Sequence, residues 1–228
     1  MKKVFTFWEG KMPDYVGLCL DTWDFEYTML NYNTLNKYTN LDVDKIQRFS
    51  LPLIADIVRV HVLRDQGGYW MDADTIMLTD KLPSENMMGF PDERAAHIGY
   101  LNTEPHSDMF EKWAKHQDDV IDSNNHNINW DVMGNLFTDS YIKSHNDIKI
   151  GSVRTRTPEI YIEADMPRKR QYERFYFQSN YELADIEHSD MLMLHNSWTP
   201  EWYKSLSTKE VLENKCTMSN ILKEVLEK

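Results

Sequence analysis

The chain has 228 residues, of which 41% are hydrophobic and 27% are charged, and its formal net charge is −12. This length suits one domain, and the composition is that of an ordinary globular protein with a packed core. The acidic balance argues against a nucleic-acid partner, because such binding rests on neutralising phosphates.

The cysteines and the first residues indicate where the protein works. Cys19 and Cys216 form no framework pattern, and two free thiols in a reducing cytosol are a simpler interpretation than one disulfide. The opening MKKVFTFWEG has too short an apolar run for a signal peptide, and no stretch approaches a membrane span. We therefore expect a cytoplasmic protein, peripheral at the inner membrane face at most.

Short elements are predicted in the first third of the chain. Lys3 to Phe7 is rich in β-branched and aromatic residues, which favours a strand. Pro13 precedes apolar residues at helical spacing. Pro52 fits the first turn of a later helix, and Gly67-Gly68 fits its end. In chain order we expect a strand at 3–7, a helix at 14–23, a strand at 26–30, a helix at 53–66 and a strand at 69–71.

The rest of the chain continues the alternation. Ser207 and Glu210 have the spacing of a capping box, and the apolar residues after them form an amphipathic stripe. Alternating strands and helices predict an α/β fold with a mixed central sheet flanked by helices. We expect a single domain over 1–228, with halves at about 1–105 and 106–206 and a C-terminal amphipathic helix at 207–228. The remaining predicted elements are strands at 87–90, 95–101 and 191–194 and helices at 109–121 and 132–143.

Two carboxylates follow the predicted strand in GGYWMDADTIML, residues 67–78. Ligands of open α/β sheets bind at the carboxyl ends of strands. In an extended chain Asp72 and Asp74 would share one face, about 7 Å apart. Brought to about 4 Å, they would repel by roughly 4 kcal/mol at an effective dielectric of 20. A divalent cation such as Mg²⁺ or Mn²⁺, completed by phosphate oxygens, would reverse that repulsion.

The Asp-x-Asp pattern alone is weak, because Asp42-Val43-Asp44 is a second copy in a polar connection, where Asp44 could cap a helix. The copy at Asp72 and Asp74 differs in its fixed distance from Asp56 and Arg59 on the preceding helix. At i and i+3 these two residues share a face. They form either part of a site or a surface ion pair worth at most about 1 kcal/mol.

The segment LPLIADIVRVHVLRDQGGYWMDADTIML resembles the DxD glycosyltransferases grouped around fungal initiation-specific mannosyltransferases, bacterial capsular-polysaccharide transferases and large clostridial glucosylating toxins. Their pattern is roughly Ser-Asp-x-x-Arg, a leucine-rich turn, then Gly-Gly-x-Tyr-x-Asp-x-Asp. Asp56, Arg59, Asp72 and Asp74 match it without a gap. Ala55 stands in place of the usual Ser, and Trp70 in place of the usual Tyr.

Two further segments are similar to the family's ends. The opening VFTFWEG looks like its first strand, with Trp8 and Gly10 in place, and MLMLHNSWTPEW looks like its closing His-x-x-Trp or Ser-Trp element. Either Trp198 or Trp202 matches the closing tryptophan. A weaker similarity is DVMGNLFTDSY, where relatives often carry Thr-Gly-Pro and then a Thr; here Gly134 and Thr138 fit and Asn135 replaces the usual Pro.

The resemblance implies a GT-A (Rossmann-like) fold and a retaining, metal-dependent hexosyltransferase that uses a nucleotide-diphosphate sugar. The implied acceptor is a glycan or lipid-linked saccharide, and the implied cofactor is Mn²⁺ or Mg²⁺. Trp8 would stack on the nucleobase, and Asp56 and Arg59 would hold the sugar beside Gly68 and Trp70. The implied catalytic residues are Asp56, Arg59, Asp72 and Asp74.

The implied metal and diphosphate contacts lie in two distant parts of the chain. Asp72 would contact the ribose and support the metal, and Asp74 would ligate the metal directly. His195 or Asn196 would complete the metal shell, and Ser197 with Trp198 would touch the diphosphate. A lone His195 is as readily a hydrogen-bonded histidine as a ligand.

Two other functions remain open. In a haloacid-dehalogenase-like phosphatase, Asp72 would be the nucleophile and Asp74 the acid–base, with Asp118-Asp119 and Asp122 in the late metal motif. Such enzymes need a long apolar strand before the first Asp, and Gly67-Gly68 interrupts it here. A non-catalytic nucleotide-sugar-binding relative is the third possibility, although both carboxylates of the motif are present.

Two further segments rich in charged residues are interpreted from their composition. HQDDVID, residues 116–122, predicts a solvated helix face. MPRKRQYERFYF, residues 166–177, is a basic and aromatic cluster in an acidic chain. Its Arg168, Lys169, Arg170 and Arg174 would either face anionic lipid or a polyprenyl-diphosphate acceptor, or lie in a solvated loop.

Overall fold

The computed structural model describes residues 3–90, 95–123, 128–129, 131–145, 147–152, 166–185 and 190–228. The chain forms two compact units, each assembled from three separate stretches. Unit 1 comprises 1–10, 26–72 and 83–152, and unit 2 comprises 11–25, 73–82 and 153–228. The predicted division of one domain near residue 105 stays a prediction.

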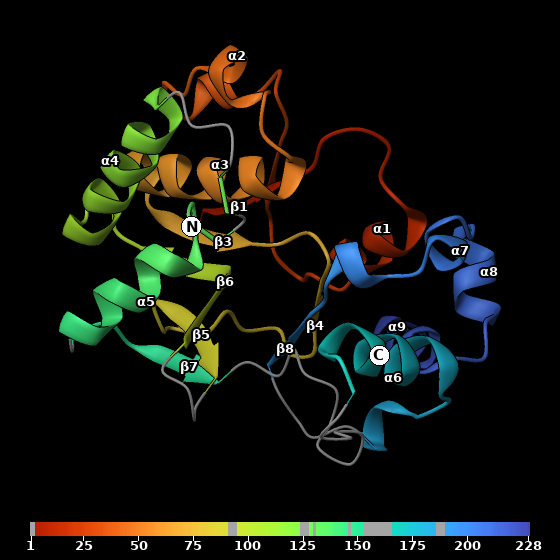
Figure 1. Ribbon diagram of the computed structural model, residues 1–228. Coiled ribbons are helices and arrows are strands. Elements are labelled where there is room, and N and C mark those ends of the chain that lie inside the picture. Colours follow the sequence, from red (N-terminus) through yellow and green to blue (C-terminus); the bar gives the residue numbers. More distant parts are fainter. Residues whose placement is uncertain are drawn as a thin grey trace. The chain divides into compact units, whose positions relative to one another are not determined.

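Unit 1 is built on a mixed six-stranded sheet in the order β2-β1-β3-β6-β5-β7 (Figure 1). β1 is parallel to β2 and β3, while β6 runs antiparallel to β3 and β5. The predicted mixed sheet flanked by helices is thus confirmed. The elements are β1 (Val4–Phe7), β2 (Thr28–Leu30), η1 (Leu35–Lys37), α2 (Val43–Ile46), α3 (Leu51–Gln66), β3 (Gly68–Met71), β5 (Met87–Phe90), β6 (Ala95–Thr103), α4 (Asp108–Asp122), α5 (Asn135–Ser144) and β7 (Ile150–Ser152).

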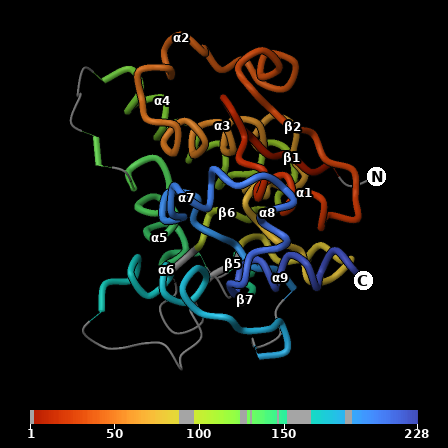
Figure 2. Tube along the Cα trace, turned by 90° about the vertical axis from the view of Figure 1, so that its right-hand side faces the viewer, coloured from red at the N-terminus to blue at the C-terminus, as the bar shows by residue number. Residues whose placement is uncertain are grey.

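The core of unit 1 lies between the sheet and its helices. Phe5 pairs with Trp70, and Trp70 pairs with Leu101, so the three side chains fall in register on one face. All three are buried in the same cluster as the apolar side of α3. α4 packs against α3 (Figures 1 and 2). This packing fixes α3 against β3 and therefore fixes the residues that the helix carries.

α3 begins and ends where local chemistry predicts. Pro52 lies in its first turn, and Gly67 ends it with a φ of 61°. Gly68 has a φ of 92°, and a Cβ there would lie 2.5 Å from the backbone oxygen of Lys3. Because only glycine fits this approach, Gly68 lets β3 pair directly with β1. The predicted helix at 53–66 and strand at 69–71 are confirmed.

Unit 2 is mainly helical and contains a two-stranded antiparallel sheet, in which Thr75 of β4 pairs with Met193 of β8. α1, α6, α8 and α9 supply its packed helices (Figure 1). Cys19 and Cys216 are both free and buried in this unit. The elements are α1 (Asp14–Asp21), β4 (Thr75–Met77), α6 (Arg168–Gln178), η3 (Leu183–Asp185), β8 (Met191–Met193), η4 (Asn196–Trp198), α7 (Glu201–Lys204), α8 (Thr208–Glu213) and α9 (Thr217–Leu226).

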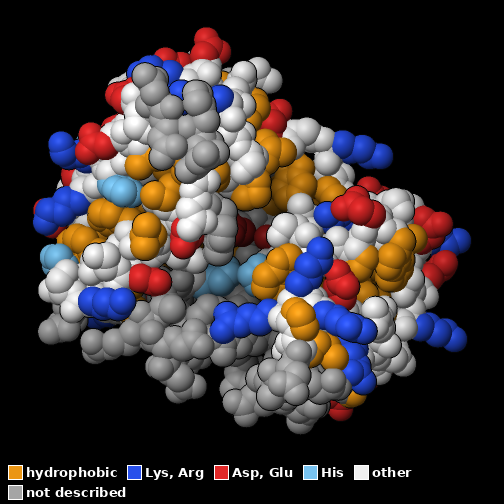
Figure 3. Space-filling view, viewed as in Figure 1, with side chains coloured by type: hydrophobic (Ala, Val, Ile, Leu, Met, Phe, Trp, Pro, Cys, Tyr) orange, Lys and Arg blue, Asp and Glu red, His pale blue; other side chains and the backbone are white. Residues whose placement is uncertain are grey.

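The basic and aromatic segment is a helix, so the interpretation as a loop was wrong. α6 buries Tyr172, Phe175 and Tyr176, which lie at i, i+3 and i+4, and exposes the cations of its first turn. Blue side chains gather in Figure 3 where α6 lies in Figure 1. The aromatic side chains are core residues of unit 2, and contact of Arg168, Lys169 and Arg170 with anionic lipid stays a prediction.

Two other expectations need correction, and two strands were missed. The C-terminal segment forms two helices, α8 and α9, rather than one, although the capping box of Ser207 and Glu210 is confirmed. Asp42, not Asp44, caps α2, because its side chain accepts a hydrogen bond from the Asp44 N–H. β4 and β7 were not predicted. No helix in the described ranges is both long and apolar enough to cross a bilayer.

Candidate functional site

Arg59 joins two carboxylates inside unit 1. Its Nη2 lies 3.0 Å from Asp56 on the same helix and 3.1 Å from Asp72 at the end of β3. The side chains of Arg59 and Asp56 are only 5% and 14% exposed, so the interpretation as a surface ion pair was wrong. The structure thus brings together three of the predicted site residues.

The guanidinium of Arg59 is held in one orientation by its surroundings. Nη1 donates to the backbone oxygen of Ile98 at 2.6 Å, and Nε donates to that of Ala55 at 3.3 Å. The group lies 5.4 Å from the ring centroid of Trp70, whose Nε1 donates to Asp72 at 2.9 Å. A planar donor fork fixed in this way suits recognition of oxygen-rich groups.

Burial changes the ionisation of the groups around Arg59. It raises the pKa of Asp56 to about 6, with Arg59 lowering and Asp72 raising that value. Burial, and then the charge of Arg59, lower the pKa of His97 to about 4. His97 lies on β6 and was not predicted as a site residue, because no spacing in the sequence links it to Arg59.

A turn from a distant part of the chain covers Asp56. A Cβ on Gly134 would lie 3.2 Å from Asp56 Oδ2 and closer still to Ile98 Cδ1, so a larger residue here would displace the Ile98 side chain and crowd Asp56. Gln117 Nε2 donates to the backbone oxygens of Asp56, at 3.0 Å, and Met133, at 2.6 Å. Gln117 is fully buried, whereas Asp118, Asp119 and Asp122 of the same segment are exposed, so the predicted solvated face is confirmed for these three carboxylates but not for Gln117.

Trp8 follows β1 in unit 1 and is half-buried. Its backbone N–H donates to the Leu30 oxygen at 3.0 Å. Its indole Nε1 is buried and has no hydrogen-bond partner among the described residues. Nearby, Tyr32 packs at a tilt on Phe7 with 5.9 Å between ring centroids, and its N–H donates to Glu9. The end of β1 therefore offers aromatic surface beside a carboxylate.

In unit 2, Asp74 is tied to the closing segment of the chain. Asp74 is 8% exposed, and its Oδ2 accepts a hydrogen bond from the Asn196 N–H at 2.7 Å. The Asn196 amide oxygen accepts from the Tyr15 hydroxyl at 2.6 Å. Burial, and then the charge of Asp74, raise the pKa of Tyr15, so the phenol keeps its proton. This cluster holds a carboxylate and an amide oxygen in fixed positions.

The other predicted residues of the closing segment surround Asn196. The ring of His195 lies 4.2 Å from that of Trp198, and Ser197 between them is exposed. Trp202 lies on α7 with 48% of its surface exposed and contacts Phe177 edge-on. Trp198 is thus the tryptophan that shares a ring contact with His195, whereas Trp202 packs on α6.

Ala73 and Asp74 form a turn between β3 and β4, with Asp72 directly before it, so the predicted extended geometry is wrong here. The second stretch of unit 1 ends at Asp72, and the second stretch of unit 2 begins at Ala73. In the described part of the chain, no three His, Cys, Asp or Glu side chains are grouped to hold a metal alone. A metal shared with substrate phosphates needs only one or two carboxylates, and the oxygens of Asp74 and Asn196 fit that donor set.

The carboxylates of the predicted phosphatase motif lie elsewhere in unit 1. Asp118 and Asp122 line a cavity with His61, which lies two positions beyond Arg59 on α3. At about 100° per residue, His61 and Arg59 point to nearly opposite sides of that helix. The arrangement gives no support to a joint role of Asp72 with Asp118 and Asp122.

Comparison with known proteins gives three findings. The profile of the family described as "Capsular polysaccharide synthesis protein" matches residues 1–221. Comparison with curated proteins finds no significant match. A solved structure described as "PaToxG Glycosyltransferase" is similar in structure to part of this chain. The matched region covers 63% of this chain and 68% of that structure's chain, with 15% sequence identity and a TM-score of 0.43.

Proposed function

Because the chain belongs to the family of capsular polysaccharide synthesis proteins, we propose that it is a glycosyltransferase of the GT-A fold. In this proposal it moves a hexosyl group from a nucleotide-diphosphate sugar to a glycan or lipid-linked precursor. The anomeric configuration is retained, and Mn²⁺ or Mg²⁺ is required.

The cluster of Asp56, Arg59 and Asp72, in which Arg59 is buried and both carboxylates are partly buried, carries this proposal. Its guanidinium is fixed by two backbone oxygens, and its carboxylates flank it at 3.0 and 3.1 Å. Donors and acceptors held so rigidly can bind the hydroxyls of one sugar without reorganising during the reaction. In this assignment Asp56 and Arg59 orient the sugar, and Asp72 meets the ribose of the nucleotide. Trp8 supplies aromatic surface for the base.

The cluster of Asp74 and Asn196 supports the metal-binding part of the proposal. Their oxygens would hold the ion, with the covalent link through Ala73 joining this cluster to Asp72. Bound there with the diphosphate, the ion would supply Lewis-acid stabilisation for the charge of the leaving group. Ser197 and Trp198 follow Asn196 directly and are assigned to the diphosphate.

No side chain is assigned as the nucleophile. In the proposed reaction the acceptor hydroxyl forms the new bond on the face from which the diphosphate departs. The bond between the anomeric carbon and the diphosphate oxygen breaks, and that oxygen takes the hydroxyl proton. Arg59 and Asp56 hold the ring during this step, so their task is orientation rather than proton transfer.

One assay separates this function from a phosphatase and from a non-catalytic binding protein. The protein is incubated with a panel of nucleotide sugars and Mn²⁺, with and without a chelator. We expect slow release of free sugar and nucleoside diphosphate that the chelator abolishes. Release of phosphate from a generic phosphoester would support the phosphatase instead, and binding without turnover in the presence of acceptors would support the binding protein.

A further inference from the structure

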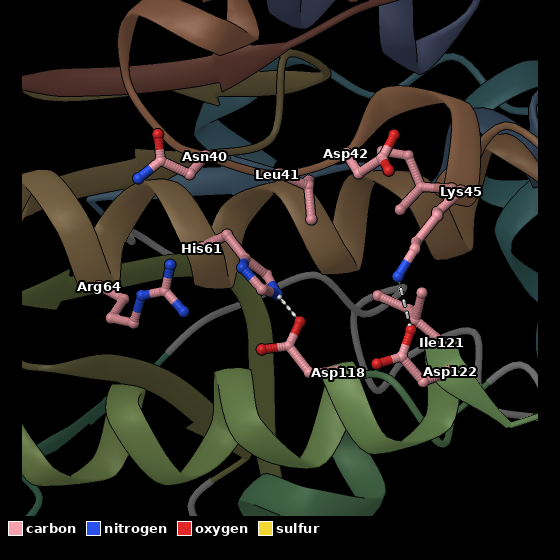
Figure 4. Close-up of a pocket in the computed structure, with 10 residues that line it drawn as sticks. Asn40, Leu41, Asp42, Lys45, His61, Arg64, Asp118, Ile121 and Asp122 are labelled. Carbon is pink, nitrogen blue, oxygen red and sulfur yellow. Dashed lines mark hydrogen bonds and ion pairs between the residues drawn. The ribbon is translucent and has the colours of Figure 1, made fainter.

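The cavity lined by His61, Asp118 and Asp122 lies in unit 1, on the side of α3 away from Arg59. It has a volume of about 210 Å³ and lies between α3, α4 and the segment leading into α2 (Figure 4). At about 30 Å³ per water it has room for roughly seven waters, or one sugar ring, and is too small for a nucleotide. The lining residues are Asn40, Leu41, Asp42, Lys45, Ile46, His61, Arg64, Asp118, Ile121 and Asp122.

His61 is the buried polar group of this cavity. It is 2% exposed, and its ring is directed from α3 toward Asp118 on α4 (Figure 4). Nε2 lies 3.5 Å from Asp118 Oδ1 but has no hydrogen-bond partner among the described residues. A buried nitrogen in this position is costly unless a ligand or water meets it. Burial, and then the charge of Arg64, lower the pKa of His61 to about 4, so the ring is neutral near pH 7.

The cations of the cavity are already matched by carboxylates. Lys45 Nζ lies 2.8 Å from Asp122, and Arg64 donates two hydrogen bonds to Asp65. Asp118 is half-exposed and has no Lys or Arg within ion-pair distance among the described residues. The cavity thus presents hydrogen-bond acceptors without a matching excess of positive charge, which disfavours an anionic ligand.

We propose that this cavity binds one monosaccharide unit of the glycan acceptor or product, with two neighbouring hydroxyls bound at His61 and Asp118. This inference rests on the proposed glycosyltransferase function, because that function supplies a saccharide chain. Neighbouring hydroxyls can meet both groups at about 2.8 Å, since the two are 3.5 Å apart: one donates to Asp118, and the other pairs with His61 Nε2, which donates or accepts according to its tautomer. Asn40 also lines the cavity and adds an amide that can both donate and accept. The described residues form no group of three metal-ligating side chains here, which favours a neutral polyol over a metal ion.

The test uses the full chain and NMR of the histidine rings, with the His61 signal assigned from its loss in His61→Gln. Glucose, galactose, mannose and N-acetylglucosamine are titrated singly, without nucleotide. We expect at least one of them to shift the His61 signal saturably. Asp118→Asn should weaken that binding about tenfold or more, because one charged acceptor is lost. The matched control is Asp119→Asn, which removes the same charge one residue away, outside the cavity, and should bind as the unmodified protein does.

Several outcomes would overturn the proposal. The first is a His61 signal that none of the four sugars shifts. The second is equal sugar affinity of the Asp118→Asn and Asp119→Asn variants. The third is a His61 signal that shifts with Zn²⁺ but with no sugar. The measurement needs no turnover, so it is independent of the donor reaction. Asp118→Asn should also keep metal-dependent hydrolysis of the donor, whereas failure of the proposed function would appear as no hydrolysis by any form of the protein.

Discussion

At the scale of single residues, Arg59 is the side chain whose loss should be most costly. It is the cation between Asp56 and Asp72 and also donates to two backbone oxygens. Arg59→Met would leave two partly buried carboxylates without their partner, and we expect the free energy of unfolding to fall by about 3 kcal/mol, the low end for a broken buried pair. Urea unfolding measures this change.

The control for Arg59 is an exposed ion pair on α4. Lys112 lies 2.6 Å from Asp108, with both side chains more than half exposed. Lys112→Met should leave the free energy of unfolding unchanged within error, because exposed pairs contribute little. Equal losses in the two variants would contradict the role given to burial.

Asp74 and Asp44 provide a direct comparison between the two Asp-x-Asp copies. Asp74→Asn keeps an oxygen that can accept from the Asn196 N–H, so the fold should be retained. It removes the charge proposed to hold the metal, and we expect Mn²⁺-dependent release of sugar to fall by at least about 10²-fold. Asp44→Asn, which changes an exposed residue of α2, should have full activity. Full turnover by Asp74→Asn would exclude the proposed metal site.

His61 should make the protein less stable in acid. Its pKa is lowered to about 4 in the folded state, so between about pH 4 and 6.5 the unfolded chain binds a proton that the folded chain does not. The free energy of unfolding therefore rises with pH in this window, by at most about 1.4 kcal/mol per pH unit from this group. The stabilising contribution of His61 has its full value above about pH 6.5.

The variant His61→Gln isolates this contribution. Asp56 and His97 also titrate in the folded state, but they are present in both proteins and cancel in the difference. Urea unfolding at several pH values should give a shallower slope for the variant below pH 6.5. Parallel slopes for the two proteins would contradict a buried, neutral His61.

At the scale of elements, the junction of α3 and β3 depends on Gly68. Gly68→Ala would place a Cβ 2.5 Å from the Lys3 oxygen at a φ of 92°, and we expect a loss of about 1–3 kcal/mol or more. Gly17→Ala is the matched control, because Gly17 lies within α1 and a Cβ added there would meet no atom within 4 Å. That change should stabilise by about 0.5–1 kcal/mol, since alanine favours a helix. Urea unfolding of both variants decides the matter.

Element boundaries were predictable where short-range chemistry determines them. Pro52 and Gly67 marked the two ends of α3, and Ser207 with Glu210 marked the start of α8. The three-residue strands β4 and β7 were missed, because each is formed only by pairing with a partner distant in sequence. In α6, three cations in the first turn obscured a helical aromatic stripe that was present in the sequence.

The residues of the candidate site also divide into those that short-range sequence spacing predicts and those that only tertiary packing brings together. Asp56, Arg59 and Asp72 were predicted because a helix and a strand joined by two glycines keep their spacing fixed. Gly134 and Gln117 reach Asp56 through tertiary packing of α4 and α5, which no local pattern encodes.

At the scale of the whole molecule, the two units cannot be separated by cutting the chain once. A fragment of residues 1–152 contains unit 1 but also α1 and β4, whose partners in unit 2 follow residue 152. Tyr15 would lose its ring contact with Tyr203, and Thr75 would lose its pairing with Met193. We expect the fragment to expose apolar surface, bind a hydrophobic dye and aggregate. A soluble fragment with a cooperative unfolding transition would contradict this.

The contact between Asp74 and Asn196, which are far apart in sequence, also has a consequence for synthesis of the protein by the ribosome. Asp56, Arg59 and Asp72 are translated within the first third of the chain, but Asp74 meets Asn196 only after 122 further residues. At about 5–20 residues per second, that interval is roughly 6–24 s. A nascent chain can therefore bring Asp56, Arg59 and Asp72 together well before Asp74 meets Asn196. Products of premature termination before Asn196 should be inactive, even when unit 1 is fully translated.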